Sequence, residues 1–396
     1  MGIGTVQGRA ENGRLIISLS GVIDSTNASR IEGEIGSMRK EHSFGSVELD
    51  CDRLEYASSA GLRVMLRLIQ EVKNTILTNV HPDIYEIMSM TGFTELAEVR
   101  KAYRLISTAG CEVIGHGANG KVYRIDPDTV VKVYRNPDAL PEIHRERDLA
   151  RLAFVAGIPT AIPYDVVRIA GGGYGSVFEM LNAKSFAKLI IDGDRTPDEA
   201  ARMSIDLLKI IHSKQVHSDS LPDMKAEALE RAEFLKDYLP AELYQKLHDL
   251  IAAVPEDDHL IHGDFHIKNI EYQNGEYLLI DMDTLGHGHP VFELAGMYNT
   301  YVGYGLVHPE SRRDFLGISP EACRDFWRRS LEYYFGTKDP AVIDGAEKKA
   351  KIVGLARIMR REIRHGGLDR EDGRKMIEAC KAQLSDLLPE TDSLVF

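Results

Sequence analysis

Cysteine is scarce in this chain of 396 residues, and its four cysteines lie far apart. They are Cys51, Cys111, Cys323 and Cys380, and no two of them form a CxxC pair. A zinc site or a disulfide framework needs cysteines at close, regular spacing, so the sequence argues against both classes. The pattern is typical of a protein that folds in a reducing compartment, and we expect a cytoplasmic location.

Long apolar runs and an excess of positive charge are also lacking. No uninterrupted apolar stretch approaches the roughly 18 residues that a membrane span needs, and residues 1–14 contain no apolar signal core, so we expect neither membrane insertion nor secretion. Lys and Arg number 48 against 61 Asp and Glu, which gives a net charge of -13. Broad contact with nucleic-acid backbone is therefore not expected. The acidic surface would suit a cationic partner, or serve solubility only.

Strands and helices alternate over the first hundred residues. Alternating apolar and polar residues predict a strand at 14–23, and further strands are expected at 47–49 and 75–80. Helical spacing of apolar residues predicts helices at 27–40 and 59–72 and a third that begins at Ile84. Such alternation is typical of a small α/β domain.

From about residue 105 the pattern changes to strands followed by helices. Two strands joined by a glycine-rich turn are expected at 111–125, a third at 129–134 and a hairpin at 166–180, with a helix at 142–155. Beyond Leu181 the predicted helices are 226–238, 242–253, 321–334, 344–364 and 371–387, with one more starting at the cap Thr196-Pro197-Asp198-Glu199. Short strands interrupt the helices only between 260 and 283. These patterns predict a strand-rich lobe followed by a helical lobe.

The glycine-rich turn, Gly115 to Gly120, has the spacing GxGxxG through Gly115, Gly117 and Gly120. Its context of strand, turn and strand disfavours a dinucleotide-binding fold, in which such glycines open a helix. It suits a flap whose backbone N–H groups cover phosphates, with Val122 placed to cover a base. The alternative is a plain flexible hairpin turn.

Lys132 lies within the apolar strand at 129–134. A lysine in such a strand either extends its amine from an exposed edge or holds nucleotide phosphates while paired with a glutamate of the next helix. Glu146 is the predicted partner, with Glu142 as the alternative.

The segment 261–270 places polar residues between isoleucines. Asp264 is followed by Asn269, and Asp281 comes twelve residues later at the end of an apolar strand. An ordinary polar loop between buried strands would explain each residue alone. Phosphoryl transfer needs a residue that orients the attacking hydroxyl and oxygen ligands for Mg²⁺. The set therefore predicts Asp264 as the base and Asn269 and Asp281 as metal ligands.

With these motifs, the chain from about Gly110 onward resembles the aminoglycoside phosphotransferase and choline kinase branch of the protein-kinase-like fold. The letters HGDFHIKN match the HGDxxxxN loop of that family, and IDMD matches its metal-binding segment. The resemblance implies that Asp264 is the catalytic base, that His262 supports the loop and that Lys268 belongs to the catalytic residues. Met282 departs from the family, which often has an aromatic residue there.

The same resemblance implies how the cofactors ATP and Mg²⁺ would bind. Lys132 would hold phosphates, and Asn269 and Asp281 would bind magnesium. A hinge from Phe178 to Asn182, with Glu179 and Leu181, would lie beside the adenine.

Residues 49–66 resemble the STAS domain of anti-sigma-factor antagonists. In that family a Ser or Thr at the start of the second long helix is phosphorylated to switch partner binding. Ser59 aligns with this phosphoacceptor, but Ser58 stands where the family has an acid. The alternative for both serines is simple capping of the helix.

The predicted fold is an α/β STAS domain at 1–104 followed by an α+β, bilobal, protein-kinase-like domain at 105–396, with an N-lobe at 105–181 and a C-lobe at 182–396. The predicted function is transfer of the ATP γ-phosphate to a hydroxyl of a small molecule, with the STAS domain as a regulatory or protein-interaction module. A protein kinase acting on a STAS serine, and a nucleotide-sensing interaction module, are the alternatives.

A helical segment before the catalytic loop, 221–254, would wall the acceptor pocket if the resemblance holds. It carries acids that could face a cationic substrate or only water: Asp223, Glu227, Glu230, Glu233 and Asp237. Helical spacing places most of them on a solvated face, which favours water.

Overall fold

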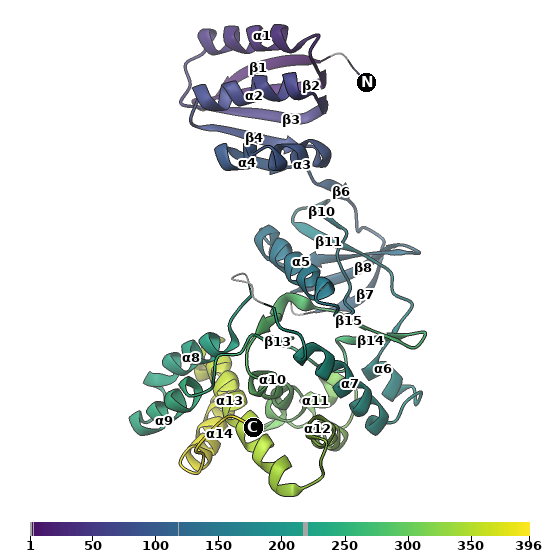
Figure 1. Cartoon of the computed structure of the whole chain (residues 1–396), viewed down its shortest axis with the longest axis vertical. Helices are drawn as coiled ribbons and strands as arrows, with labels where there is room; N and C mark the ends of the chain where they lie inside the picture. Colours follow the sequence, from purple (N-terminus) through teal and green to yellow (C-terminus); the bar gives the residue numbers. More distant parts are fainter. Residues whose placement is uncertain (1, 3, 118, 217–220) are drawn as a thin grey trace. The chain divides into compact units, whose positions relative to one another are not determined.

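A computed structural model describes residues 2, 4–117, 119–216 and 221–396 of the chain (Figure 1). The chain divides into two compact units. The first consists of Met1–Ile125, Val131–Asp138 and Asp165–Val177, and the second of Asp126–Val130, Ala139–Tyr164 and Phe178–Phe396.

The first unit begins with a five-stranded sheet in the order β1-β2-β3-β4-β5. Its strands are β1 (Thr5–Glu11), β2 (Arg14–Ile23), β3 (Ser46–Ala57), β4 (Thr75–Val80) and β5 (Glu98–Lys101), and its helices are α1 (Ala28–Glu41), α2 (Ser59–Glu71), α3 (Pro82–Met90) and α4 (Phe93–Leu96). Only β1 pairs antiparallel with its neighbour, and the other neighbours are parallel. The α/β prediction is confirmed, although β3 is longer than expected and β1 and β5 escape the sequence analysis.

The packing of this sheet follows from its sequence pattern. Every second residue of β2 is buried, which is the alternation that predicts the strand. In α2 the buried residues Leu62, Met65 and Ile69 recur at helical spacing and join the same core. Apolar periodicity therefore decides both elements.

A second sheet of six strands has the order β6-β10-β11-β9-β8-β7. The strands are β6 (Arg104–Ile106), β7 (Glu112–His116), β8 (Gly120–Asp126), β9 (Thr129–Tyr134), β10 (Asp165–Ile169) and β11 (Tyr174–Glu179). The hairpin expected at 166–180 is present as β10 and β11. The predicted domain boundary between residues 104 and 105 falls within β6, and it stays a prediction.

The second unit contains α5 (Leu140–Val155) and, from Phe178 onward, is mostly helical. Its further helices are α6 (Phe186–Ile191), α7 (Pro197–His212), α8 (Met224–Phe234), α9 (Ala241–Ala252), α10 (Val291–Tyr301), α11 (Ser311–Leu316), α12 (Pro320–Phe335), α13 (Pro340–Arg364) and α14 (Glu371–Leu387). Short 3-10 turns are η1 (Leu235–Asp237), η2 (Met282–Thr284), η3 (Gly303–Gly305) and η4 (Gly367–Asp369). The capping box predicted at Thr196 and Glu199 is present, with the Glu199 N–H 3.2 Å from the Thr196 Oγ1.

Short strands flank the loop that carries the predicted base. They are β12 (Lys184–Ser185), β13 (Leu260–Ile261), β14 (Ile270–Gln273), β15 (Glu276–Leu279) and β16 (Gly286–His287). The strands expected between 260 and 283 are therefore present, and β13 and β14 hold the two ends of residues 262–269. We call these eight residues the catalytic loop, after the role predicted for Asp264.

Helix α10 lies at the centre of the helical part and is buried nearly all round (Figure 1). It packs against α12 and α13. Leu294, Met297 and Tyr298 belong to one hydrophobic core, whereas Val291 and Phe292 belong to another. Helix α10 thus contributes residues to both cores, and it places the charged side chain of Glu293 in a buried position between them.

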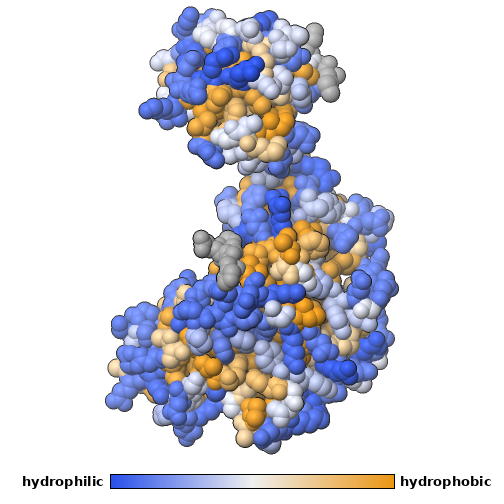
Figure 2. All heavy atoms as spheres, viewed as in Figure 1, coloured by the Kyte–Doolittle hydropathy of each residue, from blue (hydrophilic) through white to orange (hydrophobic). Residues whose placement is uncertain are grey.

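The face of the molecule in Figure 2 is largely hydrophilic, with apolar residues gathered in separate patches. In the five-stranded domain the exposed large apolar side chains include Met90, 78 % exposed, as well as Leu96 and Tyr56. None of the helices in the described ranges is both long and apolar enough to cross a membrane.

Candidate functional site

The catalytic loop begins with a backbone conformation that requires glycine. Gly263 has φ +83°, and a Cβ atom there would lie 2.4 Å from the carbonyl oxygen of Thr284. The Thr284 hydroxyl in turn donates to the carbonyl of His262 at 2.8 Å. A side chain at residue 263 would push the loop away from η2, so the glycine of the HGD motif sets this close approach.

Glu293 of α10 binds the backbone at the start of the loop. Its carboxylate accepts the N–H groups of His262, at 2.6 Å, and Gly263, at 3.1 Å. His212 Nε2 lies 3.7 Å from the same carboxylate, and His212 Nδ1 is 2.8 Å from the hydroxyl of Tyr334. Burial opposes ionisation of Glu293, but the facing His212 and the backbone N–H of His262 hold its pKa below the ordinary value. A buried carboxylate therefore fixes the loop backbone.

His262 is fully buried next to the predicted base. Burial lowers its pKa, so the ring is neutral near pH 7. Its Nδ1 accepts the N–H of Asp264 at 3.3 Å, which places the ring proton on Nε2. His262 can shape the loop in this state, which fits a supporting role.

Asp264 presents its carboxylate outward, and 44 % of its side chain is exposed. Burial opposes its ionisation, but the neighbouring His266, whose Nε2 is 3.6 Å away, is the main cause of a pKa lowered to about 2. The carboxylate is therefore ionised at pH 7. A charged, accessible carboxylate is the form that can accept a proton or orient a hydroxyl.

Asn269 and Asp281 are brought together by backbone bonds at the end of β15. The Asn269 side-chain N–H donates to the Asp264 carbonyl at 3.0 Å, and the Ile280 N–H donates to the Asn269 carbonyl at 3.0 Å. Asp281 is exposed and has a left-handed backbone, φ 63° and ψ 64°. Residues other than glycine rarely adopt this conformation, and it is often found at functional sites.

Asn269 and Asp281 place two oxygen donors at this position. An aspartate carboxylate and an asparagine amide offer the hard oxygen atoms that Mg²⁺ prefers, with phosphate oxygens and water completing the shell. Among the described residues no group of three or more His, Cys, Asp and Glu side chains could hold a metal ion. Two protein ligands fit a magnesium ion that arrives with phosphates.

Lys268 is exposed on the catalytic loop. Its Nζ lies 4.8 Å from the centre of the Phe315 ring, and the His266 ring meets Phe315 edge-on at 5.3 Å. Lys268 thus puts a positive charge on the outside of the loop, four residues after Asp264. Its catalytic role stays a prediction.

The glycine-rich turn joins β7 and β8, as predicted. The Gly117 N–H donates to the Gly120 carbonyl at 2.9 Å, and a Cβ atom at Gly120 would lie 2.1 Å from the carbonyl oxygen of Val133. Val122 is half-buried and pairs with Gly115 across the hairpin. Ala118, within the motif, lies outside the described residues. The phosphate-covering role of the turn stays a prediction.

Lys132 lies in β9, which is an inner strand of its sheet and not an edge. Its Nζ is 5.3 Å from the Tyr134 ring centre, and the side chain is half-buried. An exposed edge, the alternative expected from sequence, is therefore not its setting. In α5, Glu146 is buried and Glu142 is exposed. Since Lys132 belongs to the first unit and α5 to the second, their pairing stays a prediction.

The predicted hinge, Phe178 to Asn182, begins with the last two residues of β11 and continues beyond the strand. Glu179 is the last residue of that strand and is exposed, whereas Phe178 and Leu181 are half-buried. The Met180 N–H donates to the Asp128 carbonyl at 2.8 Å. The placement of this segment beside adenine stays a prediction.

Ser58 and Ser59 have different roles at the start of α2. The Ser58 hydroxyl caps the helix, accepting the N–H groups of Ala60 at 3.2 Å and Gly61 at 3.5 Å. Ser59 is the first helical residue and is exposed. Capping, the alternative expected for both serines, therefore holds for Ser58, and the Ser59 hydroxyl remains accessible.

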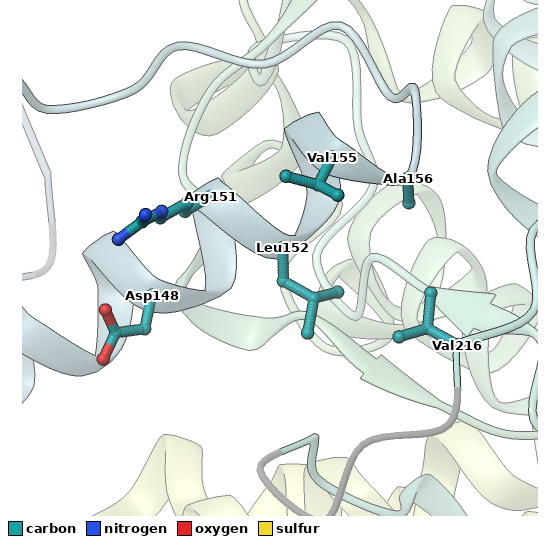
Figure 3. Close-up of a pocket in the computed structure, with 6 residues that line it drawn as sticks. All are labelled: Asp148, Arg151, Leu152, Val155, Ala156 and Val216. Atoms are coloured by element: carbon teal, nitrogen blue, oxygen red, sulfur yellow. The ribbon is translucent and has the colours of Figure 1, made fainter.

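An open pocket of about 410 Å³ lies along the C-terminal half of α5 (Figure 3). It is lined by Asp148, Arg151, Leu152, Val155, Ala156 and Val216. None of these is a predicted site residue. Carbon atoms dominate its wall, with the Asp148 and Arg151 side chains at one end (Figure 3).

Sequence reasoning misses the residues that support the loop from elsewhere in the chain, chiefly Glu293, His212 and Arg357. Arg357 of α13 donates from Nη1 to the Gly263 carbonyl at 3.3 Å. One signal for Glu293 was present, because it is the only charged residue among the eleven of α10. No comparable signal marks His212 or Arg357, which lie in ordinary amphipathic helices.

Comparison with known proteins gives two family matches and several structural likenesses. The model described as "Phosphotransferase enzyme family" matches residues 110–316, more than half of the chain, and the STAS domain model matches residues 5–106. A Bordetella bronchiseptica protein named as an anti-sigma factor antagonist, BtrV, is 31% identical over 102 residues, covering 25% of this chain and 87% of that protein.

The solved structures that resemble the chain include two aminoglycoside phosphotransferases. APH(2'')-Ib bound to ADP shares 17% identity and a TM-score of 0.47 over 78% of this chain and 99% of that one. APH(2'')-IIIa with GDP and kanamycin shares 14% and a TM-score of 0.49 over 76% and 98%. A choline/ethanolamine kinase family protein from Mesorhizobium loti shares 17% and a TM-score of 0.44 over 71% and 88%. Membership rests on the family matches: the chain belongs to the phosphotransferase enzyme family and carries an N-terminal STAS domain.

Proposed function

We propose that this phosphotransferase transfers the γ-phosphate of ATP to a hydroxyl group of a small molecule, with Mg²⁺ as the metal. The new bond joins the acceptor oxygen to the γ-phosphorus, and the bond from that phosphorus to the β–γ bridging oxygen breaks. ADP and a phosphate monoester leave, and the hydroxyl proton passes to Asp264 and then to water.

The observation that carries the proposal is the state of Asp264. Its carboxylate is ionised, with a pKa of about 2, and 44 % of the side chain is exposed on a loop whose backbone is fixed by the buried Glu293. Positioning and charge are what phosphoryl transfer requires of a protein, and both are present at this residue. His262, neutral and buried, would keep the loop in shape.

Magnesium would be held by Asp281 and the amide oxygen of Asn269. The Asn269 N–H end already binds the Asp264 carbonyl, so its oxygen is the end left for a cation. The ion would neutralise charge on the phosphates. Lys132, paired with Glu146, would bind phosphates, the glycine-rich turn with Gly115, Gly117 and Gly120 would cover them, and Val122, Glu179 and Leu181 would border the base.

The test is direct detection of products. The purified chain is incubated with Mg-ATP and pools of small alcohols, ADP is measured by a coupled assay, and phosphate monoesters are identified by ³¹P NMR. We expect ADP release that depends on the acceptor and on magnesium. Absence of both nucleotide binding and ADP release across the pools would contradict the proposal.

A protein kinase that acts on a STAS serine is the second candidate. It is favoured by one observation, the exposed position of Ser59 at the first turn of α2. In either case the STAS domain would act as a regulatory or protein-binding module. This role is supported by the STAS model match and by the 31% identical relative, which is named as an anti-sigma factor antagonist. Mapping of phosphorylated residues distinguishes the two candidates.

A further inference from the structure

Three arginines lie close to one another on α8 and α13 in a chain whose net charge is -13, and one of them, Arg357, contacts the catalytic loop. Arg231 lies on α8, and Arg357 and Arg360 lie one turn apart on α13, which packs against α8. The side chains of Arg231 and Arg360 are only 19% and 20% exposed. Burial, and after it the charge of Arg357, lowers the pKa of Arg231. Like charges held this close in a partly dry place need anions beside them.

Two of the three arginines form ion pairs with carboxylates of the protein. Arg231 is paired with Glu227 one turn earlier on α8, and Arg360 with Glu230 at 3.1 Å. Arg357 forms no ion pair with any carboxylate in the described part of the chain. Its one hydrogen bond there runs from Nη1 to the Gly263 carbonyl at 3.3 Å. Most of the five N–H donors of its guanidinium are therefore left for another partner.

Arg357 lies near Asp264, the residue that the hydroxyl of an acceptor would have to approach. Gly263, which it contacts, directly precedes Asp264 in the loop. A Cβ atom at Gly296 of α10 would lie 3.4 Å from Nη1 of Arg357, so the glycine leaves room for the guanidinium. The charge of Arg357 is close enough to help lower the pKa of Asp264. A molecule that offers its hydroxyl to Asp264 would therefore come within reach of this arginine.

A further arginine lies on the Lys268 side of the loop. Arg312 is 8% exposed, and its guanidinium lies 5.4 Å from the Tyr304 ring centre and 5.8 Å from that of Phe315, the ring that Lys268 also contacts. It donates to the Thr300 carbonyl at 2.9 Å and, like Arg357, forms no ion pair within the described ranges. Positive charge thus borders the loop from two sides.

Of the five acids on residues 221–254 that could have attracted a cationic acceptor, four are used within the protein, and the fifth, Asp237, is exposed. Glu227 and Glu230 pair with the arginines named above, Glu233 pairs with Lys236 at 3.1 Å, and Asp223 caps α8 by accepting the N–H of Lys225 at 2.8 Å. Carboxylates that are committed to internal partners offer little to an ammonium group. The balance of charge around Asp264 favours anions.

We infer that the acceptor is an alcohol that also carries an anionic group, a carboxylate or a phosphate, and that Arg357 binds this group. The inference rests on the proposed function and specifies its substrate class. A guanidinium matches the two oxygen atoms of a carboxylate or phosphate with two parallel N–H donors. An acceptor that carries an ammonium group would instead be repelled by the positive charge of these arginines. The bound anion would fix the acceptor while its hydroxyl faces Asp264.

The first experiment separates this inference from the function on which it rests. Thermal stabilisation by Mg-ATP, present in the wild type and lost in Asp281→Ala, tests nucleotide use alone. ADP release is then measured with three pools: hydroxy acids and sugar phosphates, neutral sugars and polyols, and amino alcohols and aminoglycosides. We expect stimulation by the first pool, and separate wells distinguish carboxylates from phosphates. Stimulation by the neutral or cationic pool alone, or none by the anionic pool, overturns the inference even if Mg-ATP binds.

The second experiment tests the residue. With the stimulating alcohol, Arg357→Gln should raise the acceptor KM by about 10- to 100-fold, the range for loss of a hydrogen bond to a charged group, while the KM for ATP stays nearly unchanged. Arg357→Lys should restore part of the affinity, because it keeps the charge without the fork. Arg364→Gln, an exposed arginine of the same helix, is the matched control. A lower kcat with an unchanged acceptor KM would make Arg357 a support of the loop and refute anion binding.

Discussion

Neighbouring positive groups hold the pKa of Asp264 below its ordinary value, against the effect of burial. The carboxylate is ionised down to about pH 2, since His266 lies 3.6 Å away and the charge of Arg357 acts on it as well. As the proposed base, a carboxylate so acidic would be a weak proton acceptor, and its main contribution would be to orient the hydroxyl and to take the proton late. Its replacement by an amide of the same shape isolates this contribution.

We expect Asp264→Asn to keep the fold and the binding of nucleotide but to lower turnover by about 10²–10⁴-fold, the usual range for a positioned acid or base. Steady-state kinetics with Mg-ATP and an accepted alcohol measures the loss, and nucleotide-induced thermal stabilisation checks the fold. A turnover within threefold of the wild type would reject Asp264 as the base.

Asp281 offers a separate test of the metal. Because its carboxylate and the Asn269 amide are the predicted magnesium ligands, Asp281→Ala should abolish the magnesium-dependent part of ATP binding and spare the binding of adenosine. Titration calorimetry with ATP, with and without magnesium, and with adenosine measures both. Equal loss of both ligands would indicate a folding defect instead of a lost metal ligand.

Site residues that lie close together in the sequence could be predicted as a group. Residues that meet only in the folded chain could not. Asp264, Asn269 and Asp281 lie within eighteen positions, and their order carries the pattern. Arg357 lies 94 positions from Gly263, and an arginine of an amphipathic helix looks the same wherever it points. Ser58 and Ser59 show a further limit, because only the structure distinguishes the capping hydroxyl from the exposed one.

At the scale of elements, the catalytic loop depends on α10. Glu293 accepts two loop N–H groups and faces His212 of α7, so one carboxylate ties the loop to two helices. Helix α10 is not predicted from sequence, because its residues are apolar nearly all round and show no amphipathic period. The amphipathic helix α13 and the capped helix α7 were predictable for the opposite reason.

We expect Glu293→Gln to lower the free energy of unfolding by about 1–3 kcal/mol at pH 7, since hydrogen bonds to a charged group and a buried ionic contact are weakened. Turnover should fall as well, because the loop backbone is held less firmly. Chemical denaturation measures the first effect and steady-state kinetics the second. Glu371→Gln, at an exposed glutamate paired with Lys375 on α14, is the control and should change neither.

The dependence of this effect on pH has a definite sign. The folded pKa of Glu293 lies below its ordinary value, so its ionisation adds stability above the unfolded pKa of about 4.3, and this stability is lost as the pH falls through the folded pKa. The difference between the wild type and Glu293→Gln should therefore be full at pH 7 and shrink below about pH 4. A difference that grows on acidification would contradict the assigned shift.

For the whole molecule, the order of a small α/β domain followed by a strand-rich and then a helical part could be read from sequence. Periodicity decided it, as the alternation in β2 and the helical spacing in α2 illustrate. Edge strands such as β1, in which one residue of seven is buried, carry no such pattern and were missed. Only two residues, 102 and 103, separate β5 of the STAS sheet from β6 of the next sheet.

The last prediction concerns Ser59 and the reason for joining these two domains. A phosphate on Ser59 would add about -1.5 to -2 charges at the N-terminus of α2, where the helix dipole favours them. A phosphate on Ser58 would instead remove the hydroxyl that caps the helix. Because the proposed acceptor is a small molecule, and because the connector between the two sheets is short, we expect the chain's own activity to leave both serines unlabelled.

Incubation with labelled ATP, followed by mass spectrometry of the peptides that contain Ser58 and Ser59, measures this directly. Asp264→Asn is the control for a contaminating kinase, and a series of protein concentrations separates transfer within a chain from transfer between chains. Label on Ser59 that disappears in Asp264→Asn would refute the prediction and establish the protein-kinase alternative. Label that persists in Asp264→Asn would come from another kinase, which would act on the exposed Ser59 and change the surface that a STAS partner binds.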